Sequence, residues 1–186
     1  MAAGYRIKQG TRALFAFARP LDREAAQKLL PADLYALFRK MRRSEQMHSL
    51  AVLQALESEG DVPYALAVAA LLHDVGKSRY PMNIIQRTLP VLVKAVSASA
   101  LQSLSQRDPR NFITRGFAVY VHHPSWGAEM LRETDAPADG IWLVEHHADK
   151  PDDWREHNLY HLLKTPSSGR RYELTPKRGR KWVRSR

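Results

Sequence analysis

No stretch of this 186-residue sequence alternates polar and apolar residues with the period of two that marks a half-buried strand. Apolar residues recur instead at helical spacing, as Met47, Leu50 and Leu53 do within the segment 44–60. The segment 64–74 is apolar on nearly every side, which is typical of a helix at the centre of a core. The sequence therefore predicts an all-α fold built around that helix.

Prolines and glycines set the expected ends of several helices. Pro63 suits the first turn of the central helix, and Gly76 is expected to stop it. Pro90 is expected to bend or split a long helix over 84–106, because proline removes a helical hydrogen bond. For the same reason Pro124 is expected to end one helix and start another.

Charge and composition divide the chain into three expected parts. The net charge is +10, but residues 165–186 hold eight basic residues and one acidic residue, a balance of +7. We expect an N-terminal helical segment over 1–31 with a helix at 5–18, one domain over 32–164, and a basic, disordered tail over 165–186. A weaker alternative is that this basic tail binds nucleic acid.

Two simple absences narrow the classes of function. The sequence has no cysteine, so a metal site must use histidine, carboxylate or water ligands. The longest apolar run, 62–72, is about half the ~20 residues that a bilayer span needs. A cytoplasmic protein without a membrane partner is the expectation.

The histidines gather mostly near expected helix ends. His73 and Asp74 are neighbours, and neighbouring helical side chains point ~100° apart, so they can share one site only where the helix ends. By itself this pair is equally well explained as a core histidine beside a solvated aspartate. Two further His-His pairs favour a metal site, and several imidazoles favour a transition metal. The eight are His48, His73, His122, His123, His146, His147, His157 and His161.

Three segments, in this order, resemble the HD-domain metal-dependent phosphohydrolase superfamily. SEQMHSLAV resembles the helix with the first histidine, and ALLHDVGKS resembles the His-Asp motif followed by glycine and lysine. HHPSWGAEML, followed by VEHH, resembles the extra histidine segments of the two-metal branch, which includes cyclic-dinucleotide phosphodiesterases. The resemblance covers about residues 32–150 and implies an HD-domain helical bundle with its metal site between the central helices.

The resemblance also implies roles for individual residues. Lys77 would contact a phosphate oxygen or help to protonate the leaving group, which makes Asp74 and Lys77 the implied catalytic residues. Arg43 and Arg79 are further candidates for binding substrate, and His122 has no counterpart and is expected to be structural. The implied metal ligands, with Asp74 as the bridge between two ions, are His48, His73, Asp74, His123, His146 and His147.

The chain departs from the family pattern in two places. Family members close the site with an aspartate on a later helix, but no carboxylate lies between Glu156 and Glu173, where a last helix is expected over 152–165. The Gly-Tyr-Pro segment of the cyclic-di-GMP phosphodiesterases is also absent after His147, which argues against that substrate. The candidates to replace the closing aspartate are Asp149, Asp152, Asp153, His157 and His161.

The leading hypothesis is a metal-dependent phosphohydrolase. It would act on a phosphomonoester or phosphodiester, most readily a nucleotide or related small molecule, with one or two divalent ions of Mn, Fe, Co, Ni or Zn. One alternative is a degenerate domain that binds metal or nucleotide as a sensor or scaffold. The other is a di-iron oxygenase, because the same ligands serve either chemistry.

Overall fold

The computed structural model describes residues 21–154 and 156–158, and within these residues the fold is helical without any strand. The prediction of an all-α fold is confirmed. The predicted helix at 5–18 and the basic tail lie outside the described residues. The elements are α2 (Arg23–Leu29), α3 (Ala32–Lys40), α4 (Arg43–Glu59), α5 (Tyr64–Leu72), η1 (Val75–Arg79, a 3-10 helix), α6 (Ile84–Val96), α7 (Ala98–Ser105), α8 (Arg115–Arg132), α9 (Ala138–His146) and η2 (Pro151–Trp154, also 3-10).

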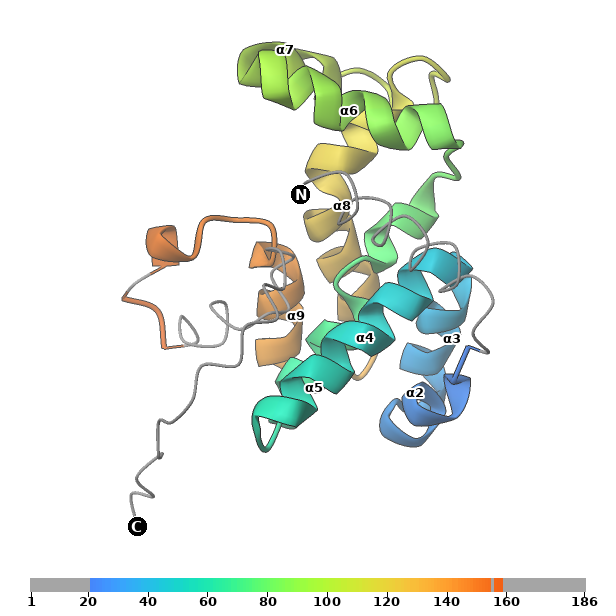
Figure 1. Ribbon diagram of the computed structural model, residues 1–186, viewed down its shortest axis with the longest axis vertical. Helices are drawn as coiled ribbons and strands as arrows, with labels where there is room; N and C mark the ends of the chain where they lie inside the picture. Colours follow the sequence, from blue (N-terminus) through green and yellow to red (C-terminus); the bar gives the residue numbers. More distant parts are fainter. Residues whose placement is uncertain (1–20, 155, 159–186) are drawn as a thin grey trace, which may run out of the picture.

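The apolar helix α5 lies in the core, as its composition predicts. Every residue from Leu66 to Leu72 is buried, and α4 and α9 both pack against this helix (Figure 1). α8 packs against α9 and η1, so the chain just after α5 lies beside α8. Burying each large apolar side chain contributes about 1.5–3 kcal/mol, so this core fixes the end of α5 firmly in place.

The long helix predicted over 84–106 is split, but not at its proline. Pro90 lies inside α6, and the break comes at Ser97, whose backbone is extended and whose hydroxyl accepts a hydrogen bond from the Ala100 amide. A serine N-cap offers the backbone an alternative to continuing the helix, and here it decides where α7 begins.

The predicted helix break at Pro124 is wrong, because α8 runs through it from Arg115 to Arg132. Proline has no amide proton to give to the carbonyl four residues earlier, which here belongs to Tyr120. The His123 side chain replaces the missing donor, since its Nδ1 lies 3.1 Å from the Tyr120 oxygen. The proline is therefore tolerated, and the bond that compensates for it also orients His123.

Gly76 does not end α5, contrary to the expectation. The helix closes at Leu72, with His73 as its cap, and Gly76 lies inside η1. A Cβ atom on Gly76 would lie 2.1 Å from the backbone oxygen of His123 and 2.7 Å from the backbone nitrogen of Gly127. Glycine is needed here because the backbones of η1 and α8 almost touch.

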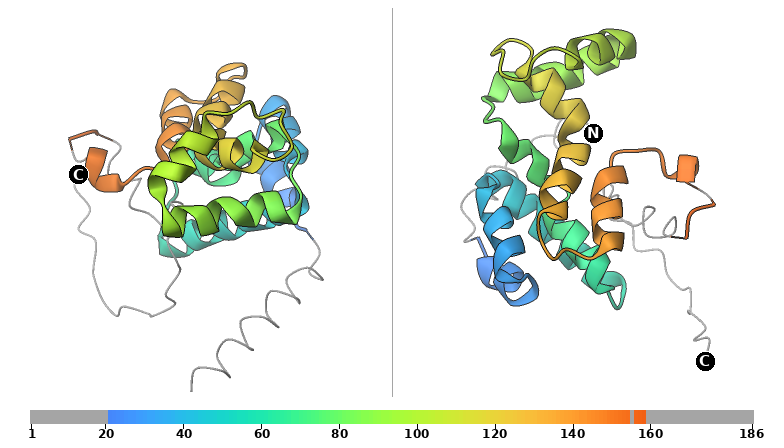
Figure 2. Two further views of the ribbon diagram at one scale, coloured as in Figure 1. Left: turned by 90° about the horizontal axis from the view of Figure 1, so that it is seen from above. Right: turned by 180° about the vertical axis from the view of Figure 1, so that it is seen from behind.

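The helices α6 and α7 form one end of the molecule, across the first turns of α8 and away from α9 (Figures 1 and 2). Arg87 of α6 pairs with the buried Glu45 of α4, with 2.5 Å between Nη2 and Oε1. Gln86 donates through Nε2 to the Phe112 oxygen at 2.6 Å, which ties α6 to the segment before α8. These contacts fix both the position and the rotation of α6.

Candidate metal centre

Four helices bring histidine and aspartate side chains to one place beside α5. His48 comes from the middle of α4, while His73 and Asp74 stand where α5 gives way to η1. His123 comes from the middle of α8, and His147 caps α9. Their possible ligand atoms form two groups, each within 4.8 Å: His48, His73 and Asp74 in one, and Asp74, His123 and His147 in the other.

Asp74 is the member that the two groups share. Its Oδ2 lies 3.7 Å from His73 Nε2, and its Oδ1 lies 3.5 Å from His123 Nε2 and 4.0 Å from His147 Nε2. The carboxylate is buried, and its two oxygens face different histidines. The two groups of possible ligands therefore meet at this one carboxylate.

The backbone sets the tautomer of the histidines around Asp74. The Nδ1 atoms of His73 and His147 lie 3.0 Å and 2.7 Å from the Ala70 and Val144 oxygens, and His123 Nδ1 lies 3.1 Å from the Val119 and Tyr120 oxygens. A carbonyl only accepts, so in each ring Nδ1 donates, and Nε2 of the neutral ring keeps its lone pair. All three Nε2 atoms are therefore presented as ligands.

The contact between His123 and His147 brings two ring nitrogens close together. Their Nε2 atoms are 3.2 Å apart, and in the neutral tautomers both atoms are bare acceptors. A proton is disfavoured there: burial, and then the Lys77 charge, lower the pKa of His123 to about 4. Burial and the neighbouring His73 and His123 also hold the pKa of His147 well below its usual value. A metal cation fits this donor set better than a proton does.

The remaining electrostatics agree with this donor set. Burial disfavours the charged form of Asp74, but His73, Lys77, His123 and His147 outweigh it and hold its pKa well below the ordinary range. Burial and the nearby His73 lower the pKa of the half-buried His48. Near neutral pH Asp74 is therefore a carboxylate and the rings of His48, His123 and His147 are neutral, the protonation states in which these groups bind metals.

Lys77 is at the edge of this cluster. Its Nζ lies 2.7 Å from Asp74 Oδ1, and its side chain keeps 27% of its exposure while Asp74 keeps 9%. The η1 turn produces this geometry, because the Lys77 amide donates to the Asp74 carbonyl at 3.0 Å. The lysine thus reaches from solvent to the buried carboxylate.

Four other residues singled out from the sequence lie elsewhere. His146 turns away from Asp74 to Asp149, at 2.8 Å from Nδ1, and belongs to neither group of ligands. Arg79 pairs with Glu129 at 2.6 Å on the exposed side of α8. Arg43 is the exposed first residue of α4, and His122 faces the Ser105 oxygen. The roles predicted for His146, Arg79 and Arg43 at the site, and the structural role expected of His122, stay predictions.

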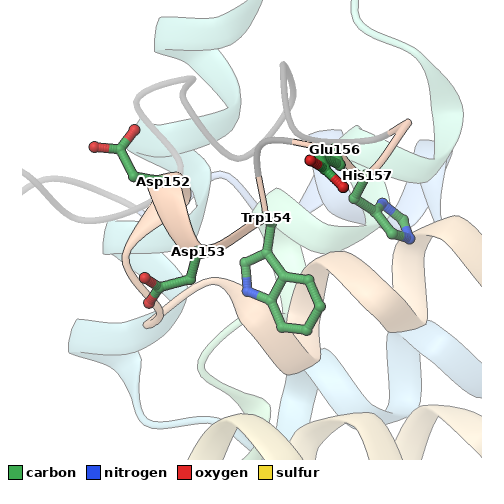
Figure 3. Close-up of a pocket in the computed structure, with 5 residues that line it drawn as sticks. All are labelled: Asp152, Asp153, Trp154, Glu156 and His157. Atoms are coloured by element: carbon green, nitrogen blue, oxygen red, sulfur yellow. The ribbon is translucent and has the colours of Figure 1, made fainter.

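The residues after α9 form an aromatic cluster beside a separate pocket. His146 packs against Trp142 and Trp154, with ring centroids 4.7 and 4.2 Å apart, and His157 stacks on Trp142 at 3.9 Å. Asp149 accepts from Trp154 Nε1 at 3.1 Å. Figure 3 shows the pocket, which is lined by Asp152, Asp153, Trp154, Glu156 and His157.

This cluster bears on the missing closing aspartate. Of the candidates to replace it, Asp149, Asp152, Asp153 and His157 belong to neither ligand group, and His161 lies outside the described residues. Within 21–154 and 156–158, Asp74 is the one carboxylate in the two groups. The role of Pro124 was also not predicted, because no signal in the sequence shows that the His123 ring turns back onto the Tyr120 oxygen.

The chain was compared with curated proteins, solved structures and protein families. No curated protein matches the chain, and no solved structure matches it. No helix in the described part is both long and apolar enough to cross a membrane. The family described as HD domain matches residues 46–165, a span that holds all five residues of the two ligand groups and more than half of the chain. The chain therefore belongs to the HD domain family.

Proposed function

We propose that this protein is a metal-dependent phosphohydrolase that cleaves a small phosphate ester at a two-metal centre bridged by Asp74. Membership of the HD domain family supports the reaction class, because proteins of this family are generally metal-dependent hydrolases. The observation that carries the proposal is the convergence of three imidazole Nε2 atoms on the two oxygens of one buried carboxylate.

The donor set fits divalent transition metals, since imidazole nitrogens with a single carboxylate suit Mn, Fe, Co, Ni or Zn better than Mg. When bound, such ions supply Lewis-acid charge for the phosphoryl oxygens and lower the pKa of a water toward neutrality. The chain's own part is to hold the ligands in place, with the Nδ1 atoms of His73, His123 and His147 bound to backbone oxygens and the core of α5 behind them.

Lys77 is the residue of this chain that would meet the substrate. The Lys77 ammonium lies 2.7 Å from the Asp74 carboxylate, and with that carboxylate engaged as a metal ligand it would be free to pair with a phosphoryl oxygen. Charge that builds up on those oxygens in the transition state is then stabilised by a cation already in position. Its partial exposure lets the lysine make this move without unfolding η1.

A second candidate function is metal binding without hydrolysis. The observation that favours it is that Asp74 is the only carboxylate of the ligand groups in the described part of the chain. A di-iron oxygenase would use the same ligands and would differ by a mixed-valence EPR signal and oxygen consumption.

A substrate panel on defined samples tests the proposal. The full chain, freed of metal and reloaded with Mn, Co, Zn or Fe, is assayed against phosphomonoesters, phosphodiesters and nucleotides. We expect hydrolysis in the reloaded protein, and its loss together with metal binding in the His73→Ala/Asp74→Ala variant. Hydrolysis that persists in the metal-free double variant would overturn the proposal, whereas bound metal without any hydrolysis would favour the second candidate.

A further inference from the structure

The helix α6 presents an apolar face to solvent. Ile85, Leu89, Leu92 and Val96 follow one another at positions i, i+4, i+7 and i+11, which places them on one side of the helix. They are 68%, 40%, 58% and 89% exposed. A surface helix of a globular domain normally turns such a stripe toward the core, so this orientation has to be explained.

The opposite side of α6 is held against the domain by specific contacts. Gln86 and Pro90 are buried, and Gln86 bonds the Phe112 oxygen. Gly116 of α8 lies so close that a Cβ atom there would be 2.1 Å from the Gln86 oxygen. Together with the ion pair between Arg87 and Glu45, these contacts prevent α6 from rolling its apolar stripe inward.

The loop that joins α7 to α8 adds two large apolar side chains at the same end of the molecule. Phe112 and Ile113 are 63% and 76% exposed. The loop is well braced, since Asn111 accepts from the Ile113 amide and Arg115 donates to the oxygens of Pro109 and Arg110. The same contact from Gln86 to Phe112 holds this loop beside the start of α6 (Figure 2).

The exposed apolar residues of α6 and of the loop lie at one end of the molecule and are called here the α6 face. In the described part of the chain nine large hydrophobic residues are exposed, and Tyr64 is the one that lies elsewhere. On α6 the exposed apolar positions cover an arc of about 160° around the helix axis. This arc is wider than the narrow apolar stripe of a helix that packs against one other helix, as in a coiled coil. The α6 face consists of Ile84, Ile85, Leu89, Val91, Leu92, Val96, Phe112 and Ile113.

The charge around the α6 face selects among possible partners. Residues 84–115 contain five basic side chains and one acidic side chain, Asp108, and because Glu45 neutralises Arg87 a balance of +3 remains. Arg107 and Arg110 are exposed in the loop beside Phe112, and Lys94 lies over the Tyr120 ring, behind the apolar stripe. A second copy of this chain would bring the same positive charge, whereas an anionic surface would be attracted by it.

We propose that the α6 face docks this protein on an anionic lipid bilayer. Its apolar side chains enter the boundary between headgroups and acyl chains, and the basic side chains of the loop meet the negative headgroups. The expectation of no membrane partner rested on the lack of a spanning segment, and a protein that lies on the surface needs none. The inference is independent of the proposed hydrolase activity.

Co-sedimentation with vesicles tests this proposal on the full chain. Phosphatidylcholine vesicles with and without phosphatidylserine are pelleted after mixing, at low and at raised salt. We expect the protein to pellet with the anionic vesicles and to be released as salt screens the attraction. Ile85→Ser/Leu92→Ser should weaken this partitioning by about tenfold or more, because two inserted side chains are lost.

Matched variants separate the α6 face from the rest of the surface. Tyr64→Ser, which changes an exposed apolar residue elsewhere, should leave vesicle binding unchanged. Arg107→Gln/Arg110→Gln should reduce binding to anionic vesicles and flatten its dependence on salt. Because all the variants keep residues 165–186, attraction by the basic tail alone is the same in each.

Three results would overturn the proposal. One is a wild-type chain that stays in the supernatant with anionic vesicles. Another is equal binding by the wild type and Ile85→Ser/Leu92→Ser, which would assign the attraction to the basic tail. The third is a wild-type dimer in analytical ultracentrifugation that this variant returns to monomer without any vesicle binding, which would make the α6 face a contact between copies.

Discussion

The imidazole rings around Asp74 depend on the backbone oxygens behind them. Each bonded Nδ1 fixes a tautomer and a ring orientation, and the opposite nitrogen is thereby committed to the cluster. This distinguishes His147, bonded to the Val144 oxygen, from its neighbour His146, which bonds an aspartate side chain outside the cluster. Two histidines that look equivalent in the sequence are therefore unequal in the structure.

His147→Gln and His146→Gln form a matched pair of substitutions. We expect His147→Gln to lower the metal content by one ion per chain, since it removes a ligand from the group with Asp74 and His123. His146→Gln should keep the wild-type content. Elemental mass spectrometry of the purified variants measures their metal content per chain. An equal loss of metal from both variants would mean that His146 is also a ligand.

Lys77→Gln tests the role of the lysine in turnover. Removal of a cation that stabilises developing charge typically costs about 100-fold in kcat or more, and we expect a loss of that size with metal content retained. Lys28→Gln in α2 is the control: an exposed ion pair such as Lys28 with Glu24 contributes little, so kcat should change by about twofold at most. Steady-state kinetics on one phosphodiester measure both, and a Lys77→Gln enzyme as fast as wild type would exclude the proposed role.

The lowered histidine pKa values predict how the metal-free protein responds to acid. His123 has a pKa of about 4 in the folded chain and 6.5 as the ordinary value, so between these values the unfolded chain binds more protons. Folding stability should therefore fall as the pH is lowered from about 6.5 toward 4. Thermal melts of chelator-treated protein across this range measure the effect. His123→Gln should show a shallower fall, and an identical slope would contradict this assignment.

At the scale of elements, close contact between η1 and α8 holds the two ligand groups together. Asp74 lies two residues before Gly76, and His123 supplies the backbone oxygen that Gly76 approaches. The sequence pointed to both residues but not to this contact. Pro124 looked like a helix end because nothing local indicates that the His123 ring replaces its missing donor. The break at Ser97 was not predicted either, because Pro90 is the stronger helix-breaking signal in the same stretch.

Gly76→Ala should disturb the centre without changing any ligand. A Cβ 2.1 Å from the His123 oxygen forces η1 and α8 apart, and overpacking of this kind costs about 1–3 kcal/mol or more. We expect a lower melting temperature and weaker metal binding. Gly140→Ala in α9 is the milder control, because its nearest neighbour is 3.2 Å away. Thermal unfolding with and without metal compares them, and an unaffected Gly76→Ala protein would show that the contact is dispensable.

At the scale of the whole molecule, the sequence was sufficient for the fold class and the family. Helical periodicity and the order of the histidine segments predicted both, because a buried apolar helix ending in His-Asp is readable without coordinates. The separation of His146 from His147 and the outward stripe of α6 were not predictable. Both depend on how one helix is rotated against its neighbours, which is decided by contacts distant in sequence, such as Arg87 with Glu45. The predicted boundaries at 31 and 164 remain predictions.

The central claim is that two metals share Asp74 and act together in phosphate ester hydrolysis. The most direct test measures the hydrolysis rate of bis(p-nitrophenyl) phosphate against the number of Mn or Co equivalents bound to the metal-free chain. For the wild type we predict little activity with the first equivalent and a steep rise with the second. The Asp74→Asn variant should retain neither ion and should gain no activity when metal is added. Full activity at one equivalent, or no hydrolysis with both sites filled, would contradict the account.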